Sequence, residues 1–321
     1  MRVAVVINGA AGGLLGRADA AGTVVAALRA AGLDPLVVPD AGAAAPLAER
    51  LDAALAAGAA AVVVGGGDGT IAAAAQRLAG TGVPLGILPL GTMNVLARDL
   101  GLPLGLEEAA AALAHGNARA IDAAEVNGHV FLCASVIGLP SHLGRHRERE
   151  RGRLGLRGRL RFAVAALRGA LRHPPLRLRV ELGAGGGPPG LRVWTRALAV
   201  TPNRLDEDAP RFPARSVLDG GVLGLYLARR FGAWWVVRFA LRLLLRRRWG
   251  DHPELASAAA PEIVLRSGRR RLRVMNDGEA MLLETPLRYR IRPGALTVLA
   301  PPPPAPPPSA AAEAPALAAV A

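Results

Sequence analysis

The sequence contains two short glycine-containing segments whose residue types are suited to binding phosphate. The first consists of Gly65, Gly66, Gly67, Asp68, Gly69 and Thr70. Its glycines allow a tight turn with exposed backbone N–H groups, and a helix expected to begin at Thr70 would favour anions at its N-terminus. Asp68 would repel a bare phosphate, but it can hold a magnesium ion or its water shell. A purely structural turn is the alternative.

The second segment runs from Pro89 to Gly101 and reads Pro-Leu-Gly-Thr-Met-Asn-Val-Leu-Ala-Arg-Asp-Leu-Gly. It again places a glycine turn before a helix, with the Thr92 hydroxyl and the Asn94 amide at the helix start. Both side chains have groups that can bind a nucleotide. The alternative is that Thr92 only caps the helix, which requires no ligand.

Each glycine segment follows an apolar run that is typical of a buried strand. Short β-branched runs alternate with Ala-rich helical stretches over the first part of the chain, which indicates a parallel sheet with crossover helices. The expected strands are Val3–Ile7, Leu36–Val38, Ala61–Val64 and Leu85–Leu88. Ligands bind beyond the carboxyl ends of such strands, so the loops after three of these strands should lie on one edge of the sheet.

After about residue 120 the pattern changes to strand candidates without regular helices between them. We therefore expect an α/β domain with a parallel sheet over residues 1–120 and a β-rich domain over 121–300. The expected strands of the second domain are Val130–Val136, Val193–Val200, Val222–Ala228, Leu272–Met275 and Leu296–Leu299. Two basic amphipathic helices are expected over 147–172 and 234–248, and the Pro/Ala-rich tail 301–321 should be disordered.

The basic charge of the chain is concentrated in its second part. The net charge is +14, and all 39 basic residues are Arg. Up to residue 120 there are 7 Arg against 9 acidic residues, and beyond it 32 against 16. Any anionic surface should therefore meet the second part, although an Arg-rich composition without Lys also reflects codon bias. Peripheral membrane contact and an ordinary solvated surface are both open, and we expect no nucleic acid partner.

Several classes of site are excluded by residue type. A P-loop requires a Lys that the chain lacks, and the single cysteine, Cys133, cannot form an intrachain disulfide or a cysteine zinc site. The six His show no metal-ligand spacing. No apolar run reaches the roughly 18 residues that a spanning helix needs, and the N-terminus reads as a strand rather than a signal peptide. We expect a cytoplasmic protein, either soluble or peripheral at the inner membrane surface.

Taken together, the two glycine segments resemble those of the diacylglycerol kinase catalytic domain family, which also contains sphingosine and ceramide kinases. NAD kinases and phosphofructokinases share the Gly-Gly-Asp-Gly-Thr element, but Pro-Leu-Gly-Thr-x-Asn followed by Ala-Arg-Asp-Leu is similar to the lipid kinases. The residues in the place of the family's Asn-Pro-x-Ser/Ala-Gly loop are Asn8, Gly9, Ala10, Ala11 and Gly12. Further matches in the family's order are Ile121-Asp122, Val126-Asn127-Gly128, Phe131, Ala134-Ser135, Pro213-Ala214 and Leu218-Asp219-Gly220.

The resemblance implies an NAD kinase/diacylglycerol kinase-like nucleotide domain and a β-sandwich lipid domain, with ATP and the lipid meeting between them. Asn276-Asp277-Gly278-Glu279 matches the family's Asp-Gly-Glu motif, whose carboxylates are credited with accepting the proton of the substrate hydroxyl. An Asp/Glu pair around a glycine turn can supply one carboxylate as the base and the other to orient it. Solvated acids on a β-hairpin turn are the alternative.

The implied site residues fall into three groups. Asp277 and Glu279 are the catalytic candidates. Asp68, Asp122 and Asp219 are candidates for a magnesium network, which phosphoryl transfer needs in order to offset charge on the phosphate oxygens. The nucleotide-binding candidates are Asn8, Gly9, Ala10, Ala11, Gly12, Gly65, Gly66, Gly67, Asp68, Gly69, Thr70, Thr92 and Asn94.

The expected reaction is transfer of the γ-phosphate of Mg-ATP to the hydroxyl of a diacylglycerol-like lipid, as in phospholipid biosynthesis. Two departures from the family keep alternatives open: Gly9 replaces its usual Pro, and the run from Ile71 to Ala75 replaces the Asn-Glu that follows the Thr in many members. The alternatives are NAD kinase-like phosphorylation of a soluble substrate and a non-catalytic, membrane-binding regulatory member. Diacylglycerol, a sphingoid base and a polyprenol are all open as the lipid, and so is the oligomeric state.

Overall fold

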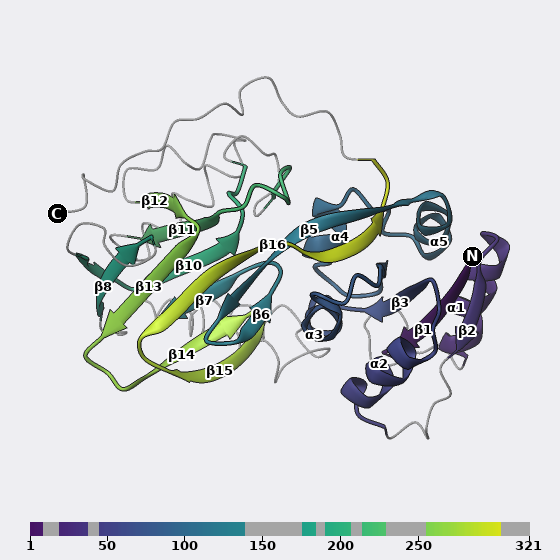
Figure 1. The fold of residues 1–321 in the computed structure, drawn as a ribbon, viewed down its shortest axis with the longest axis horizontal. Helices are drawn as coiled ribbons and strands as arrows, with labels where there is room; N and C mark the ends of the chain where they lie inside the picture. The colour runs from purple at the N-terminus through teal and green to yellow at the C-terminus, as the bar shows by residue number, and fades with distance from the viewer. Residues whose placement is uncertain are drawn as a thin grey trace, which may run out of the picture.

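The computed structural model describes residues 1–8, 19–37, 45–138, 175–183, 190–206, 214–228 and 255–302. Figure 1 shows two parts side by side along the longest axis, and buried apolar side chains form a separate core in each. All of the described helices belong to the N-terminal part, whereas the second part is built from strands. Within the described ranges, no helix is both long enough and apolar enough to span a lipid bilayer.

The N-terminal part is a parallel sheet flanked by helices. Its strands lie in the order β2-β1-β3-β4, and each neighbouring pair is parallel. The strands are β1 (Arg2–Ile7), β2 (Asp34–Val37), β3 (Ala61–Gly66) and β4 (Leu85–Pro89). The helices are α1 (Ala20–Ala30), α2 (Leu47–Ala56), α3 (Asp68–Leu78), α4 (Val95–Asp99) and α5 (Leu106–His115). The strands β1, β3 and β4 are buried almost throughout, as expected for a parallel sheet that helices cover.

The second part contains two sheets that share one apolar core. One sheet has the order β12-β11-β10-β7-β14-β15, and its neighbours are antiparallel. The other contains β16, β13, β8 and β9 and continues the N-terminal sheet through β16. The strands are β5 (Asn117–Val126), β6 (His129–Phe131), β7 (Ser135–Gly138), β8 (Leu176–Leu182), β9 (Leu191–Thr195), β10 (Ala197–Pro202), β11 (Leu223–Ala228), β12 (Leu255–Ala260), β13 (Glu262–Ser267), β14 (Arg271–Asn276), β15 (Glu279–Glu284) and β16 (Leu287–Ala300).

The long strand β16 joins the two parts (Figure 1). Near its start it pairs antiparallel with β13, and near its end Val298 pairs in parallel with Leu85 of β4. β5 runs antiparallel beside β16 along both halves, with a register shift between Arg292 and Leu296. The buried side chains Leu296 and Val298 belong to the core of the N-terminal part. The last described strand of the chain therefore completes the core that the first strands begin.

The structure confirms the predicted fold class, an α/β part with a parallel sheet followed by a strand-rich part with antiparallel pairing. Two predicted strands are each divided, because Val130–Val136 is interrupted between β6 and β7 and Val193–Val200 is interrupted at Arg196. The expected boundary at residue 120 falls inside β5, and the proposed domain division stays a prediction. The predicted basic helices over 147–172 and 234–248 lie outside the described residues, as does the tail from residue 303.

Asp122 braces the junction between β5, β16 and the loop that precedes β11. Its carboxylate accepts a hydrogen bond from Gly221 N at 2.7 Å and another from Gly294 N at 2.9 Å, and the residue is 4% exposed. Both carboxylate oxygens therefore bind backbone donors that lie in different segments of the chain. Asp219, in the same loop, is exposed to solvent.

Replacing Asp122 with Asn should lower the free energy of unfolding by about 1 kcal/mol, because the amide nitrogen cannot accept a hydrogen bond from one of the two backbone N–H groups. Urea denaturation in the absence of magnesium measures the change. Asp219→Asn is the matched control, since the same substitution on an exposed side chain should alter stability by less than about 0.5 kcal/mol. Equal losses in the two variants would contradict the structural role of Asp122.

Candidate active site

The two glycine segments meet backbone to backbone at the carboxyl ends of β3 and β4. A β-carbon on Gly91 would lie 2.5 Å from the α-carbon of Gly67, so the two loops can approach only if residue 91 has no side chain. Leu90 N also donates to the carbonyl of Gly66 at 3.1 Å. This contact brings the N-termini of α3 and α4 to one edge of the sheet, as the sequence predicted for such loops.

Asp68 holds the two loops together by capping α4. Its carboxylate accepts hydrogen bonds from Asn94 N at 3.0 Å and from Val95 N at 2.7 Å. The helix α3 begins at Asp68 and not at Thr70 as expected. The alternative of capping by Thr92 is wrong as well, because the cap position of α4 is Asn94 and the capping carboxylate comes from α3. Thr92 is instead exposed at the surface of the loop.

Asn94 shapes its own loop from a left-handed conformation, with φ of 49°. Its side-chain oxygen accepts from Gly91 N at 2.9 Å, and its amide nitrogen donates to the carbonyls of Pro89 and Gly91. The residue is 7% exposed, so its amide is committed to the loop. Its predicted contact with nucleotide stays a prediction.

The end of β1 joins the same edge through Asn8. Its side-chain nitrogen donates to the Thr70 hydroxyl at 2.9 Å, and its backbone N donates to the carbonyl of Gly65 at 2.8 Å. Three predicted loops thus begin beside one another, at Asn8, Gly65 and Leu90. The remaining predicted residues of the first loop lie outside the described residues, namely Gly9, Ala10, Ala11 and Gly12.

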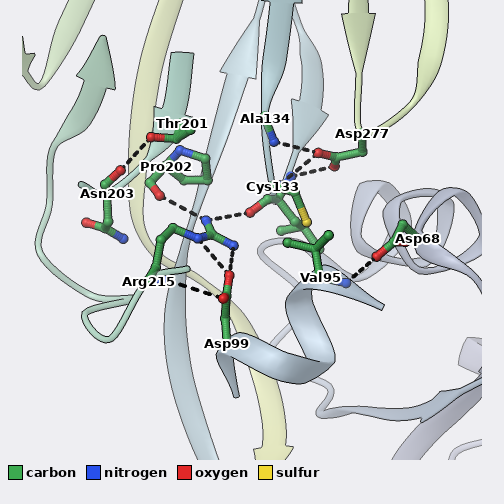
Figure 2. A network of polar contacts seen from close by, with 11 residues as sticks. Asp68, Val95, Asp99, Cys133, Ala134, Thr201, Pro202, Asn203, Arg215 and Asp277 are labelled. Carbon is green, nitrogen blue, oxygen red and sulfur yellow. Dashed lines mark hydrogen bonds and ion pairs between the residues drawn. The ribbon is translucent and has the colours of Figure 1, made fainter. Parts of the chain in front are cut away.

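Asp277 lies in the turn between β14 and β15 and is held by the backbone between β6 and β7. Its carboxylate accepts from Leu132 N at 2.7 Å, Cys133 N at 2.8 Å and Ala134 N at 2.9 Å (Figure 2). Its own N donates to the carbonyl of Ala134 at 2.9 Å, and its φ is 47°. These bonds explain why the predicted strand Val130–Val136 is interrupted, since its central N–H groups bind a carboxylate instead of a neighbouring strand.

Burial governs the protonation of Asp277. Removal of the carboxylate from water raises its pKa above the ordinary range, while the three N–H groups and the charge of Arg215 offset part of that rise. The neighbouring thiol of Cys133 has its pKa raised well above the usual value, first by burial and then by the negative charge of Asp277. Figure 2 shows Cys133 between Asp277 and the Asp68–Val95 contact. The thiol is therefore neutral and serves as a small apolar neighbour of the carboxylate.

Glu279 brings a second carboxylate against the glycine segment. Its Oε1 lies 3.6 Å from the position that a β-carbon on Gly69 would occupy, although more than two hundred residues separate them in the sequence. The residue is exposed, and it directly follows the turn that contains Asp277. The two predicted catalytic acids therefore lie where the second part of the protein faces the N-terminus of α3.

The three predicted magnesium candidates do not converge. Asp68 and Asp122 each use both carboxylate oxygens on backbone N–H groups, and Asp219 is exposed on a loop. Among the described residues, no group of three or more His, Cys, Asp or Glu is placed to hold a metal ion. The described residues thus do not form a preformed protein cage for magnesium, and the metal roles of these three residues stay predictions.

An ion pair that the sequence did not single out lies next to the acids. Arg215 Nη2 is 2.8 Å from Asp99 Oδ2, and the two side chains are 3% and 1% exposed. Arg215 Nη1 also donates to the carbonyls of Leu132 and Pro202 (Figure 2). Asp99 belongs to the Ala-Arg-Asp-Leu stretch that resembles the lipid kinases, and Arg215 directly follows Pro213-Ala214. The chain contains many arginines, however, and no sequence feature indicates that either of these two side chains is buried.

Gly91→Ala should destabilise the protein by about 1–3 kcal/mol, because a β-carbon at this position overlaps the backbone of Gly67 and the loops cannot separate without breaking the Asp68 cap. Gly67→Ala is the matched control, since its β-carbon would lie 3.4 Å from Gly91 Cα, at the edge of ordinary contact. Chemical denaturation of both variants measures the difference. Equal stability losses would contradict the close approach of the loops.

Comparison with known proteins shows which family the sequence is similar to. The model of the diacylglycerol kinase catalytic domain matches residues 2–126. A protein of Pseudomonas fluorescens named "Probable lipid kinase YegS-like" is 33% identical over 295 residues, which cover 86% of this chain and 89% of that protein. A diacylglycerol kinase of Mycobacterium tuberculosis is 37% identical over 138 residues, or 41% of this chain and 44% of that protein.

Solved structures share the fold. The crystal structure of a diacylglycerol kinase from Bacillus anthracis superposes with a TM-score of 0.62 at 18% identity. The superposition covers 94% of this chain and 97% of the Bacillus chain. A second crystal structure from the same organism gives a TM-score of 0.69 at 21% identity. The full-length likeness to the Pseudomonas protein and the match of the catalytic-domain model lead to one conclusion: this chain belongs to the diacylglycerol kinase catalytic domain family of lipid kinases.

Proposed function

We propose that the protein transfers the γ-phosphate of ATP to the hydroxyl group of a diacylglycerol-like lipid. One observation above all supports this proposal: the turn that contains Asp277 and Glu279 faces the glycine segment at the N-terminus of α3. A base for a hydroxyl group and a cradle for phosphates are thus adjacent. Phosphoryl transfer requires chiefly that these two partners be held in position and that negative charge be stabilised.

The glycine segments act as the phosphate-binding side of the site. Backbone N–H groups in the first turn of α3, which begins just after β3 ends at Gly66, favour an anion, as does the hydroxyl of the exposed Thr92 in the adjoining loop. Asp68 keeps the two loops in contact by capping α4 and so fixes their spacing. Magnesium enters with ATP as part of the substrate, since this ion is usually bound by phosphate oxygens and water with only one or two carboxylates.

Asp277 is the acid that we assign as the base. Three backbone N–H groups fix its orientation, and burial raises its pKa toward the range in which a carboxylate can accept a hydroxyl proton effectively. Glu279 is exposed beside Gly69 and is the alternative base. Its position between Asp277 and the phosphate-binding turn suits a group that orients the acceptor hydroxyl.

Asp277→Asn should lower kcat for lipid phosphorylation by about 10²–10⁴-fold, because the amide cannot accept the proton. The measurement is transfer of radiolabelled phosphate from ATP to diacylglycerol in mixed micelles between pH 5 and 9. In the wild type, kcat should fall as the pH falls through the raised pKa of Asp277, because protonation removes the base.

Glu279→Gln is the matched control for this experiment. Its kcat should still fall as the pH falls, which we call the acidic limb of the pH profile, because Asp277 still titrates. This holds whether or not the maximal rate is lower than in the wild type. If Asp277→Asn keeps this limb and Glu279→Gln loses it, the base is Glu279. Circular dichroism of both variants verifies that they are folded.

The same assay separates the two alternatives to lipid phosphorylation. Phosphorylation of NAD without any lipid product would replace the lipid kinase proposal with a soluble substrate. Binding of ATP and vesicles with no turnover on a panel of diacylglycerol, sphingoid base and polyprenol would identify a non-catalytic member.

We also propose that the protein contacts an anionic bilayer through an outer arginine face, formed by Arg177 and Arg179 of β8, Arg192 and Trp194 of β9, and Arg266 of β13. Arg179 of β8 pairs in register with Arg192 of β9 on one side and with Arg266 of β13 on the other. Three arginines therefore form a row across three neighbouring strands. Like charges directly opposite one another destabilise a sheet unless an anion compensates them. Glu181 pairs with Arg266, at 2.8 Å. An anionic lipid surface would compensate the remainder of this row.

Trp194 gives this face an aromatic group suited to the membrane interface. Its side chain is 61% exposed, and the guanidinium of Arg177 lies 4.5 Å from its ring centroid. Exposed Trp beside Arg is typical of surfaces that lie at the level of lipid headgroups. The face therefore combines charge complementarity with an interfacial anchor.

Arg179→Glu with Arg192→Glu should weaken binding to phosphatidylglycerol-containing vesicles by about tenfold or more, since each Arg near an anionic surface contributes about 1 kcal/mol. Vesicle co-sedimentation at low and high salt measures the effect. The control with equal net charge is Arg269→Glu with Arg270→Glu, in the exposed turn before β14. Equal weakening by both pairs of substitutions would mean that vesicle binding depends only on net charge and not on the outer arginine face. Stronger binding to RNA than to vesicles would contradict a bilayer as the partner of this face.

A further inference from the structure

The side chain of Arg215 contacts three segments that are distant in the sequence. It forms its ion pair with Asp99, the last residue of α4, through Nη2 at 2.8 Å and Nε at 2.9 Å, and its backbone N lies 3.3 Å from Asp99 Oδ1. Its Nη1 donates to Leu132 O at 2.7 Å and to Pro202 O at 2.9 Å. One planar guanidinium thus joins the helix after the second glycine segment to two segments of the second part.

The contact with Leu132 reaches the anchor of Asp277 through a single peptide group. Leu132 O and Cys133 N belong to the same peptide plane. Arg215 binds its oxygen, and Asp277 accepts from its N–H at 2.8 Å. A cation on the carbonyl oxygen polarises the peptide and strengthens the N–H as a donor. Leu132 N, in the preceding peptide, donates to the other carboxylate oxygen.

We propose that Arg215, fixed by Asp99, is a positioning residue that sets the orientation of Asp277 relative to α4 and the phosphate-binding loops. The geometry uses the fork of an Arg side chain, because the carboxylate is bound at Nε and Nη2 while both carbonyls are bound at Nη1. A Lys in its place keeps the charge but cannot bridge all three. The inference rests on the proposed catalytic role of Asp277.

The charges around Asp277 give this arrangement a measurable signature. Arg215 is the cation that lowers its pKa, whereas Cys133 is a neutral thiol and Glu279 is an exposed neighbour in the same turn. The negative charges of Asp68 and Asp99 act on the Cys133 thiol, where they help to raise its pKa. Loss of Arg215 should therefore raise the pKa of Asp277 further and move the acidic limb of activity to higher pH.

The test uses a variant that removes both charges, because breaking a buried pair by changing one partner leaves an unpaired charge and can unfold the protein. Asp99→Leu with Arg215→Met replaces the pair with apolar side chains of similar length. We expect a folded protein whose kcat is about 10- to 100-fold lower, as for a small misplacement of a catalytic group, with KM for ATP within about threefold of wild type. Arg215→Lys, which keeps the charge, should show a smaller shift of the acidic limb.

The control is the exposed ion pair Arg271–Glu284, on the same hairpin as Asp277. Arg271→Met with Glu284→Gln should leave kcat and the pH profile unchanged. A folded Asp99→Leu/Arg215→Met variant with wild-type kcat and an unmoved acidic limb would overturn the inference.

A readout that does not need turnover separates this inference from the proposed function. Carboxyl ¹³C NMR follows the titration of Asp277 directly, with the signal assigned by its loss in Asp277→Asn. Its midpoint should move to higher pH in the double variant and stay in place in the control. If no lipid is phosphorylated but the midpoint moves, the kinase proposal fails and the positioning of Asp277 stands, whereas an unmoved midpoint overturns the positioning role.

Discussion

The carboxylate of Asp277 is bound by three successive backbone N–H groups at the point where β6 and β7 separate. These N–H groups bind the carboxylate instead of a neighbouring strand, so Asp277 satisfies the donors that the interruption leaves without a strand partner. The arrangement fixes the turn after β14 against the segment 132–134. It also places Glu279 beside Gly69 of the N-terminal part. This interaction therefore fixes the place where the acidic turn meets the N-terminal part.

The long strand β16 links the two parts of the protein through strand pairing. Because it pairs with β13 at one end and lies beside β4 at the other, the second part is attached to the N-terminal sheet by continuous backbone hydrogen bonding. Gln76 of α3 adds a contact by accepting from Val130 N at 2.7 Å. The glycine loops and the acidic turn are therefore held by elements of regular structure, which suits a reaction that depends on positioning.

Charge has two separate uses in this Arg-rich chain. Arg215 is buried with Asp99 and contacts backbone carbonyls at the junction of the two parts, where a planar group with several donors is needed. The outer arginine face is exposed on the far strands β13, β8 and β9, where like charges lie opposite one another. Arg thus holds buried backbone segments in position at the junction, and it makes the surface of the far strands electropositive.

The sequence alone determined the fold class, the parallel arrangement of the first strands and the meeting of the glycine loops at one sheet edge. These features depend on local patterns, because apolar periodicity and glycine turns act over a few residues. The Asp-Gly-Glu turn was recognisable as a motif, but its position was not, since nothing local relates residue 279 to residue 69. Only the tertiary structure decided that Asp68 caps α4, that Asp122 joins β16 to the loop before β11 and that Arg215 pairs with Asp99. The reason is that the partner of a charged side chain depends on burial and on distance in space, and both arise only when segments distant in the sequence have folded against one another.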